Sequence, residues 1–291
     1  MSGKTVLITG GNTGIGKQTA LALAKLGARV IITSRNERKG DLAQMEIREA
    51  TGSKAVDSMQ LDLSSFASIE RCAAELLAKY ERLDVLVLNA GLILDTRTQT
   101  EQGFETTFGV NHLGHFYLVS LLRERVIASA PARIVVVSSD AHKAVREFDF
   151  DDLMAERSYK PFQVYACSKL ANILFAKELA RQLEGTGVDV NAVHPGAVRT
   201  RFGRDGDTGM FGRALLTLAS PFMISAESGA KTSVHVASAP ELEGHSGGYY
   251  ARSREAQPNA AASDPANAAR LWQLSEELIT QGKARASARA S

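Results

Sequence analysis

The chain has few cysteines, and this shortage excludes whole classes of protein. Cys72 and Cys167 are the only two among 291 residues, too few for a disulfide framework or a cysteine-based metal cluster. His112 and His115 lie three apart, but no acid or cysteine cluster accompanies them at zinc-ligand spacing, so we predict no metal site. The low cysteine content favours a reducing compartment, and we expect a cytoplasmic protein.

Long apolar runs and net charge are also lacking. No run of about 20 apolar residues could span a bilayer, so we expect no integral membrane segment. An apolar strand pattern begins within about five residues of Met1, which leads us to expect no signal peptide. The net charge of +2 gives no electrostatic reason to predict a nucleic-acid partner.

Hydrophobic residues are nevertheless plentiful, at 44% of the chain against 23% charged residues. This balance is typical of a soluble globular protein, and 291 residues suffice for one large α/β domain or two small ones. We favour a single domain over residues 1–281. Residues 282–291 are rich in Ala, Arg and Ser, and we expect them to form a disordered tail.

Short apolar runs alternate with amphipathic stretches of helical period through the first two thirds of the chain, which predicts βαβ units and a parallel sheet. We predict seven strands, near Thr5–Thr9, Arg29–Ser34, Ala55–Leu61, Val85–Asn89, Arg133–Ser138, Asp189–His194 and Gly248–Ala251. Helices are predicted near Ile15–Leu26, Glu37–Thr51, Ser65–Tyr80, Glu101–Ile127, Phe162–Leu183, Ala226–Ser238 and Pro265–Ile279. Because parallel crossovers are right-handed, this order predicts a doubly wound α/β sheet with its ligand at the carboxyl ends of the strands.

The first predicted strand leads into a glycine-rich turn, Gly10-Gly11-Asn12-Thr13-Gly14-Ile15-Gly16. A turn of this kind before a helix presents backbone N–H groups that can bind a dinucleotide pyrophosphate. Gly10 permits the tight turn, while Gly14 and Gly16 let the backbone approach the phosphates. An ordinary glycine-rich turn between a strand and a helix is the alternative.

A Tyr-x-x-x-Lys sequence is the second pattern that indicates chemistry. Tyr165 and Lys169 begin an apolar helical run, and Ser139 follows a predicted strand. Residues four apart share a helix face, so we expect the Lys169 ammonium to lower the pKa of the Tyr165 phenol. A phenol, an ammonium and a hydroxyl suit proton transfer to a carbonyl that accepts a hydride. With the glycine-rich turn, they predict a nicotinamide-dependent oxidoreductase.

These motifs, in this order, resemble the short-chain dehydrogenase/reductase family over nearly the whole chain. The resemblance also rests on Asn89-Ala90-Gly91, on Asn111 in Asn-His-Leu-Gly-His and on Pro195-Gly196-Ala197-Val198-Arg199-Thr200. It implies a Rossmann-type fold and four catalytic residues, Asn111, Ser139, Tyr165 and Lys169. It also implies a set of cofactor-binding residues: Gly10, Asn12, Thr13, Gly14, Ile15, Gly16, Ser34, Arg35, Asn36, Asp62, Leu63, Asn89, Ala90, Gly91, Tyr165, Lys169, Pro195, Gly196, Val198 and Thr200.

The same resemblance implies a role for each catalytic residue. Ser139 would hold and polarise the substrate carbonyl oxygen, and Tyr165 would protonate it. Lys169 would also bond the nicotinamide ribose, and Asn111 would keep a helix kink and a water for a proton relay. Ser138 is the competing hydroxyl, but the alternation of side chains along a strand places it on the opposite face.

The end of the second predicted strand indicates which nicotinamide cofactor is used. An acid there would bond the ribose 2′-hydroxyl and repel a 2′-phosphate, whereas an arginine binds phosphate through charge-assisted hydrogen bonds. The sequence reads Ser34-Arg35-Asn36 at this place, so we predict NADP(H). A solvated surface charge is the alternative for Arg35.

The sequences Asn-Thr-Gly-Ile-Gly-Lys and Asn-His-Leu-Gly-His-Phe further resemble the retinol dehydrogenase branch, which is related to light-dependent protochlorophyllide reductases. The resemblance implies hydride transfer between nicotinamide C4 and the carbonyl or alcohol carbon of a small apolar substrate. A photochemical or C=C reductase and a non-enzymatic NADP-binding sensor or partner protein are the alternatives. We also expect an apolar substrate lid near residues 198–224, with a core or dimer-contact helix as the alternative. The sequence does not decide whether the protein forms a homo-oligomer.

Overall fold

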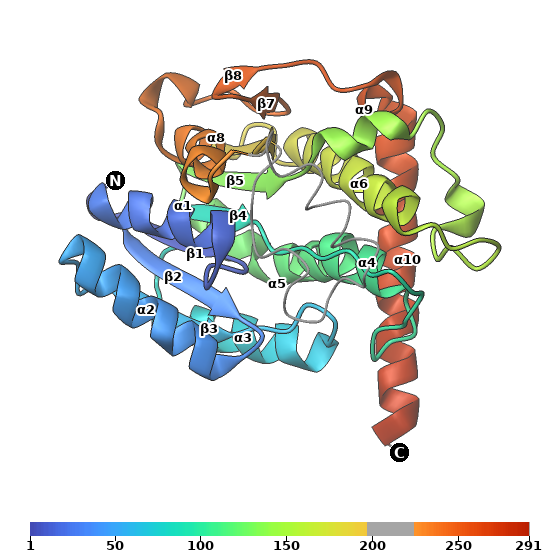
Figure 1. Cartoon of the computed structure of the whole chain (residues 1–291), viewed down its shortest axis with the longest axis horizontal. Helices are drawn as coiled ribbons and strands as arrows, with labels where there is room; N and C mark the ends of the chain where they lie inside the picture. The colour runs from blue at the N-terminus through green and yellow to red at the C-terminus, as the bar shows by residue number, and fades with distance from the viewer. Residues whose placement is uncertain (197–223, 291) are drawn as a thin grey trace.

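The structure is a computed structural model that describes residues 1–196 and 224–290, and a central sheet organises it (Figure 1). Eight strands lie in the order β3-β2-β1-β4-β5-β6-β7-β8. Their bounds are β1 (Thr5–Ile8), β2 (Arg29–Ser34), β3 (Val56–Gln60), β4 (Val85–Leu88), β5 (Ala132–Val137), β6 (Val188–His194), β7 (Tyr249–Ala251) and β8 (Arg254–Glu255). The first seven pair in parallel, which confirms the doubly wound, Rossmann-type α/β sheet in a single domain.

The eighth strand, β8, was not predicted, and it pairs with β7 in the antiparallel direction. Arg252 and Ser253 make the turn between them with φ angles of 54° and 56°. Two-residue hairpin turns of this left-handed kind usually carry Asn or Gly. The turn therefore lacks the residues by which a hairpin is recognised in a sequence.

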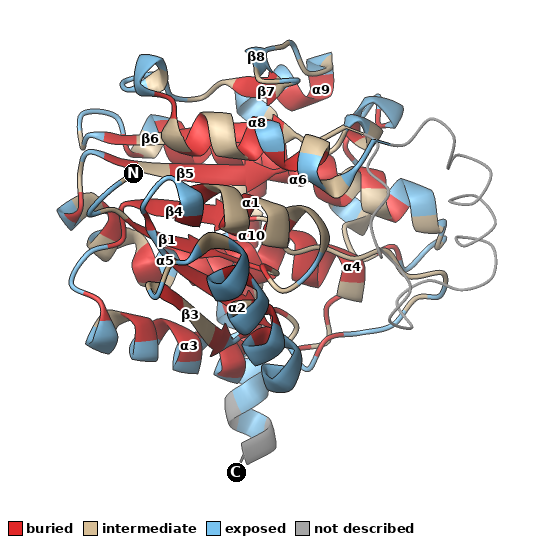
Figure 2. Ribbon diagram, turned by 60° about the vertical axis from the view of Figure 1, so that its left-hand side comes forward, coloured by how far each residue is buried: buried red, intermediate tan, exposed pale blue. Residues whose placement is uncertain are grey.

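Helices cover both faces of the sheet. Their bounds are α1 (Gly14–Lys25), α2 (Glu37–Thr51), α3 (Phe66–Lys79), α4 (Thr106–Phe108), α5 (Gly114–Ala128), α6 (Pro161–Gln182), α8 (Ala226–Ser238), α9 (Ala260–Ser263) and α10 (Pro265–Ala290). Successive strand residues alternate between two cores: Leu7 and Leu86 belong to one and Val6 and Val87 to the other, so the strands are buried on both sides (Figure 2). Among the described helices, none is long and apolar enough to cross a membrane.

The helix predicted over Glu101–Ile127 is instead three shorter elements. The buried carboxylate of Glu105 accepts hydrogen bonds from Thr107 N at 2.8 Å and Phe108 N at 2.7 Å, so the helix begins only after it. A π-helical turn, Gly109–Leu113, then separates α4 from α5. All of its residues are buried, so the hydrophobic pattern of the sequence does not mark the break.

The last helix, α10, is longer than predicted and extends to Ala290, where we expected a disordered tail from residue 282. Ala and Arg are strong helix formers, and the added turns also have partners. Arg285 Nη1 donates to Gln102 O at 3.0 Å, and its guanidinium lies 5.9 Å from the Phe104 ring centroid. These partners lie far away along the chain, so composition alone did not indicate them.

Candidate active site

The predicted site residues gather at the carboxyl ends of the parallel strands, where a doubly wound sheet binds its ligand. Gly10 follows β1, Arg35 follows β2, Asn89 follows β4, Ser139 lies just beyond β5 and Pro195 follows β6. Two predicted cofactor residues, Val198 and Thr200, lie outside the described residues. So does the predicted lid, apart from Ile224 at its end.

The glycine-rich turn between β1 and α1, which includes Asn12 and Thr13, and the first residues of α1, which include Ile15, form a narrow backbone cradle. Gly10 has a φ of 63°, in the left-handed region that favours glycine. A Cβ on Gly16 would lie 2.4 Å from Gly10 O and 2.5 Å from Asn89 Nδ2, so only glycine fits there. The first turn of α1 has no acidic residue and no side-chain cap. Its N–H groups therefore fit the pyrophosphate of a dinucleotide.

The π-helical turn Gly109–Leu113 is the kink expected at Asn111. The Asn111 side chain hydrogen-bonds to two residues outside this turn. Its Oδ1 accepts a hydrogen bond from Leu92 N at 2.8 Å, and its Nδ2 donates to Leu92 O at 2.9 Å and to Ser168 Oγ at 3.0 Å. The residue is fully buried. Asn111 thus connects the segment after β4 with helix α6.

Ser139, Tyr165 and Lys169 come together beside this turn. The Ser139 hydroxyl hydrogen-bonds with the Tyr165 phenol, and Lys169 Nζ lies 5.6 Å from the Tyr165 ring centroid. Lys169 Nζ also donates to Val137 O at 3.2 Å. Ser138 is turned away, because its Oγ donates to Lys169 O at 2.6 Å, as the strand alternation predicted.

His115 is a residue of the site whose role the sequence did not indicate. Thr9 Oγ1 accepts hydrogen bonds from Asn89 N at 2.8 Å and Ala90 N at 3.0 Å, and it lies 3.4 Å from Val87 O and 2.8 Å from His115 Nε2. The proton on His115 Nδ1 bonds Asn111 O at 3.1 Å. Burial lowers the pKa of His115 to about 4, which keeps this ring neutral. The histidine therefore connects the cofactor turn to the Asn111 turn.

Comparison with known proteins identifies the family. Residues 4–209 match the family model of the short chain dehydrogenases. The chain belongs to this family. It is 45% identical over 290 residues to retinol dehydrogenase 14 of Mus musculus, which covers 96% of this chain and 86% of that protein. It is 46% identical over 279 residues to retinol dehydrogenase 12 of Homo sapiens, and the match covers 96% of this chain and 87% of that protein.

A solved structure agrees with this membership. A crystal structure of an uncharacterized protein from Mycobacterium Paratuberculosis has a TM-score of 0.77 and 33% identity, covering 96% of this chain and 94% of that one. The resemblance to retinol dehydrogenases seen in the motifs is confirmed by the curated relatives. As a short-chain dehydrogenase, the chain is an oxidoreductase that transfers hydride with a nicotinamide cofactor.

The electrostatics of this short-chain dehydrogenase differ in one respect from what its sequence suggested. Burial raises the pKa of Tyr165 to about 12, and the hydrogen bond with Ser139 only partly offsets this. The sequence predicts that Lys169 lowers the pKa of this phenol, but burial raises it instead. Burial also lowers the pKa of Lys169 to about 8. The site therefore holds a neutral phenol beside an amine with a pKa of about 8.

The remaining predicted cofactor residues lie along the ends of β2 and β3. Ser34 Oγ donates to Asn36 O at 2.9 Å, and Asn36 Oδ1 accepts from Lys39 N at 2.9 Å, so Asn36 caps α2. Asp62 Oδ1 accepts hydrogen bonds from the backbone and the hydroxyl of Ser64. Two further predicted residues differ in exposure: the Leu63 side chain packs in the core, while Arg35 is exposed.

Proposed function

We propose that this short-chain dehydrogenase is an NADP(H)-dependent carbonyl reductase or alcohol dehydrogenase for a small apolar substrate. The observation that carries the proposal is the neutral phenol of Tyr165, which meets the Ser139 hydroxyl beside the buried Lys169 amine. Two relatives are named retinol dehydrogenases, and retinol is a largely apolar alcohol. Their similarity supports a substrate of the same kind.

In the reductive direction, the substrate oxygen would lie between Ser139 and Tyr165. Ser139 Oγ accepts a hydrogen bond from Ala141 N at 3.2 Å, so its own proton is available to polarise that oxygen. Bound NADPH would supply the hydride that the carbonyl carbon accepts. Tyr165 donates its proton to the oxygen, and Lys169, with a pKa of about 8, is placed to stabilise the phenolate and return a proton to it. Oxidation of the alcohol runs these steps in reverse.

We further propose that Arg35 selects the phosphorylated cofactor. It follows Ser34 directly after the carboxyl end of β2, where a carboxylate would favour the unphosphorylated ribose. The exposed guanidinium can donate two hydrogen bonds to a 2′-phosphate.

Turnover of NADPH and NADH with a panel of apolar aldehydes and ketones tests the proposal, with Tyr165→Phe as the paired variant. The wild-type enzyme should oxidise NADPH faster than NADH with at least one member of the panel. Tyr165→Phe should keep its NADPH affinity and lose at least about 100-fold in kcat, the lower range for general acid–base catalysis. Near-normal turnover by that variant would reject the acid role, and a preference for NADH would reject the cofactor assignment.

A further inference from the structure

His142 lies three residues after Ser139 and bonds to its backbone. The residue is fully buried, and its Nδ1 lies 2.6 Å from Ser139 O. On the other side of the ring, Nε2 lies 3.3 Å from the backbone nitrogen of Asn259, which comes from the segment between β8 and α9. The imidazole therefore bridges the residue that carries the catalytic hydroxyl and a segment far along the chain.

The two partners determine which form of the histidine is present. The backbone N–H of Asn259 can only donate, so Nε2 must be an unprotonated acceptor. The proton therefore sits on Nδ1 and bonds Ser139 O. Burial lowers the pKa of His142, whereas the hydrogen bond to Ser139 O and the charge of Asp140 raise it. Lys143 lowers it further, and the net lowering favours the neutral ring. Only this neutral tautomer serves both partners at once.

Asn259 holds the turn after Ser139 at two further points. Its Nδ2 donates to His142 O at 3.2 Å and to Val145 O at 2.6 Å. Its Oδ1 accepts from Ala262 N at 3.2 Å and so caps the short helix α9. The Tyr249 ring lies 5.3 Å from the His142 ring in an edge-to-face arrangement. The backbone from Ser139 to Val145 is thus held from outside by residues that follow β6 in the sequence.

We propose that His142 and Asn259 are positioning residues that hold Ser139 in place for the reaction. The inference rests on the proposed function, because it takes the Ser139 hydroxyl as the group that polarises the substrate. Ser139 caps the 3-10 turn Asp140–Ala144, because its Oγ accepts a hydrogen bond from Ala141 N. A shift of the Ser139 carbonyl therefore moves its hydroxyl away from Tyr165, and a displacement of about 1 Å can lower a rate about 100-fold.

A double-mutant cycle with Ser139 tests this inference. His142→Phe keeps an aromatic ring against Tyr249 but removes both hydrogen bonds. It should lower kcat about 10- to 100-fold while leaving the NADPH dissociation constant within about twofold of wild type. In the Ser139→Ala background the same change should lower kcat by less than about threefold, because the group it positions is already gone. Asn259→Ala removes the hydrogen bonds to His142 O and Val145 O. It should lower kcat by less than His142→Phe does, and its effect on kcat should likewise shrink in the Ser139→Ala background.

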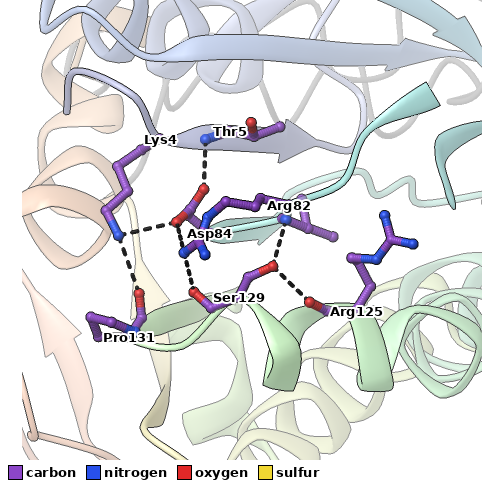
Figure 3. Close-up of polar contacts among 8 residues, drawn as sticks. Lys4, Thr5, Arg82, Asp84, Arg125, Ser129 and Pro131 are labelled. Atoms are coloured by element: carbon purple, nitrogen blue, oxygen red, sulfur yellow. Dashed lines mark hydrogen bonds and ion pairs between the residues drawn. The ribbon is translucent and has the colours of Figure 1, made fainter.

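Ser129→Ala is the matched control for loss of stability. Ser129 lies before β5, at the opposite end of the strand from Ser139, and Figure 3 shows it beside Arg125. It is fully buried and also makes two hydrogen bonds, from Leu83 N at 2.9 Å and to Arg125 O at 2.7 Å. This variant should unfold at lower urea concentration with kcat unchanged.

The outcomes separate this inference from the proposed function. Equal losses of kcat from His142→Phe in both backgrounds, or no loss in the folded single variant, would overturn the positioning role. If His142→Phe does not fold, Asn259→Ala decides by the same comparison. Normal turnover by Ser139→Ala alone would instead reject the proposed role of Ser139, and the positioning role with it.

Discussion

Asn111 pairs with Leu92 as a strand residue would, since its side-chain amide both accepts from Leu92 N at 2.8 Å and donates to Leu92 O at 2.9 Å. The pairing brings the segment after β4 against the π-helical turn. A Cβ on Gly91 would lie 3.2 Å from Asn111 Oδ1 and 3.3 Å from Lys169 Nζ. Gly91 therefore lies against both the Asn111 amide and the Lys169 amine.

The first prediction concerns this amide. Asn111→Leu keeps the approximate volume but leaves two partly buried backbone groups of Leu92 without partners, each of which would cost about 1–3 kcal/mol if fully buried. We expect the free energy of unfolding to fall by at least about 2 kcal/mol, measured by urea denaturation, with a parallel loss of turnover. Asn111→Asp keeps the acceptor for Leu92 N and should lose less stability. Equal stability of the leucine variant and the wild type would contradict this account.

A second prediction concerns the pH dependence of reduction. Because burial lowers the pKa of Lys169 to about 8, the ammonium is lost as pH rises through that value. The pKa of Tyr165 is about 12, so the phenol stays protonated over the same range. We expect kcat/KM to fall above about pH 8, measured between about pH 6 and 10 with NADPH and a carbonyl substrate. Lys169→Arg, which stays charged, should be slower but should show no such fall.

The third prediction concerns cofactor selection by Arg35. One charge-assisted hydrogen bond to a phosphate is worth about 1.5–3 kcal/mol, so Arg35→Ala should weaken NADPH binding roughly 10- to 100-fold. The affinity for NADH should change little, and fluorescence titration measures both. Arg38→Ala removes another exposed arginine, three residues on in the first turn of α2, and is the matched control. Equal losses for both cofactors, or equal effects of both variants, would reject the assignment.

Local sequence signals predicted most of this fold. Helix α2 has the predicted bounds because Asn36 caps its start and Gly52, with a φ of 69°, ends it. A local motif also predicted that Tyr165 and Lys169, two of the candidate catalytic residues, lie one helical turn apart, and both are in α6. Part of what was missed depends on partners distant in sequence, as with the extension of α10 and its contacts to Phe104. No local pattern connects Asn259 with His142, because only folding brings them together.

The last prediction concerns a charged cluster at the other end of the strands (Figure 3). The buried Asp84 carboxylate accepts hydrogen bonds from Arg82 Nη2 at 2.8 Å, Thr5 N at 2.9 Å and Lys4 Nζ at 3.0 Å. Burial alone would raise the pKa of Asp84, but these three donors lower it overall. A lowered carboxyl pKa stabilises the fold fully above the unfolded value, about 3.9, and the stabilisation is lost as pH falls towards the folded value.

Asp84→Asn keeps the shape of the side chain but removes its charge. It should lower the free energy of unfolding by about 1–2 kcal/mol at pH 7, since Arg82 and Lys4 are partly exposed and solvent screens their attraction. The difference between the two proteins should shrink as the pH falls below about 3.9, where the carboxyl of the unfolded wild-type chain takes up a proton before that of the folded protein does. Urea denaturation at a series of pH values measures this difference. A difference that stays constant down to pH values where the wild type still folds would show that the charge of Asp84 does not carry the stabilisation.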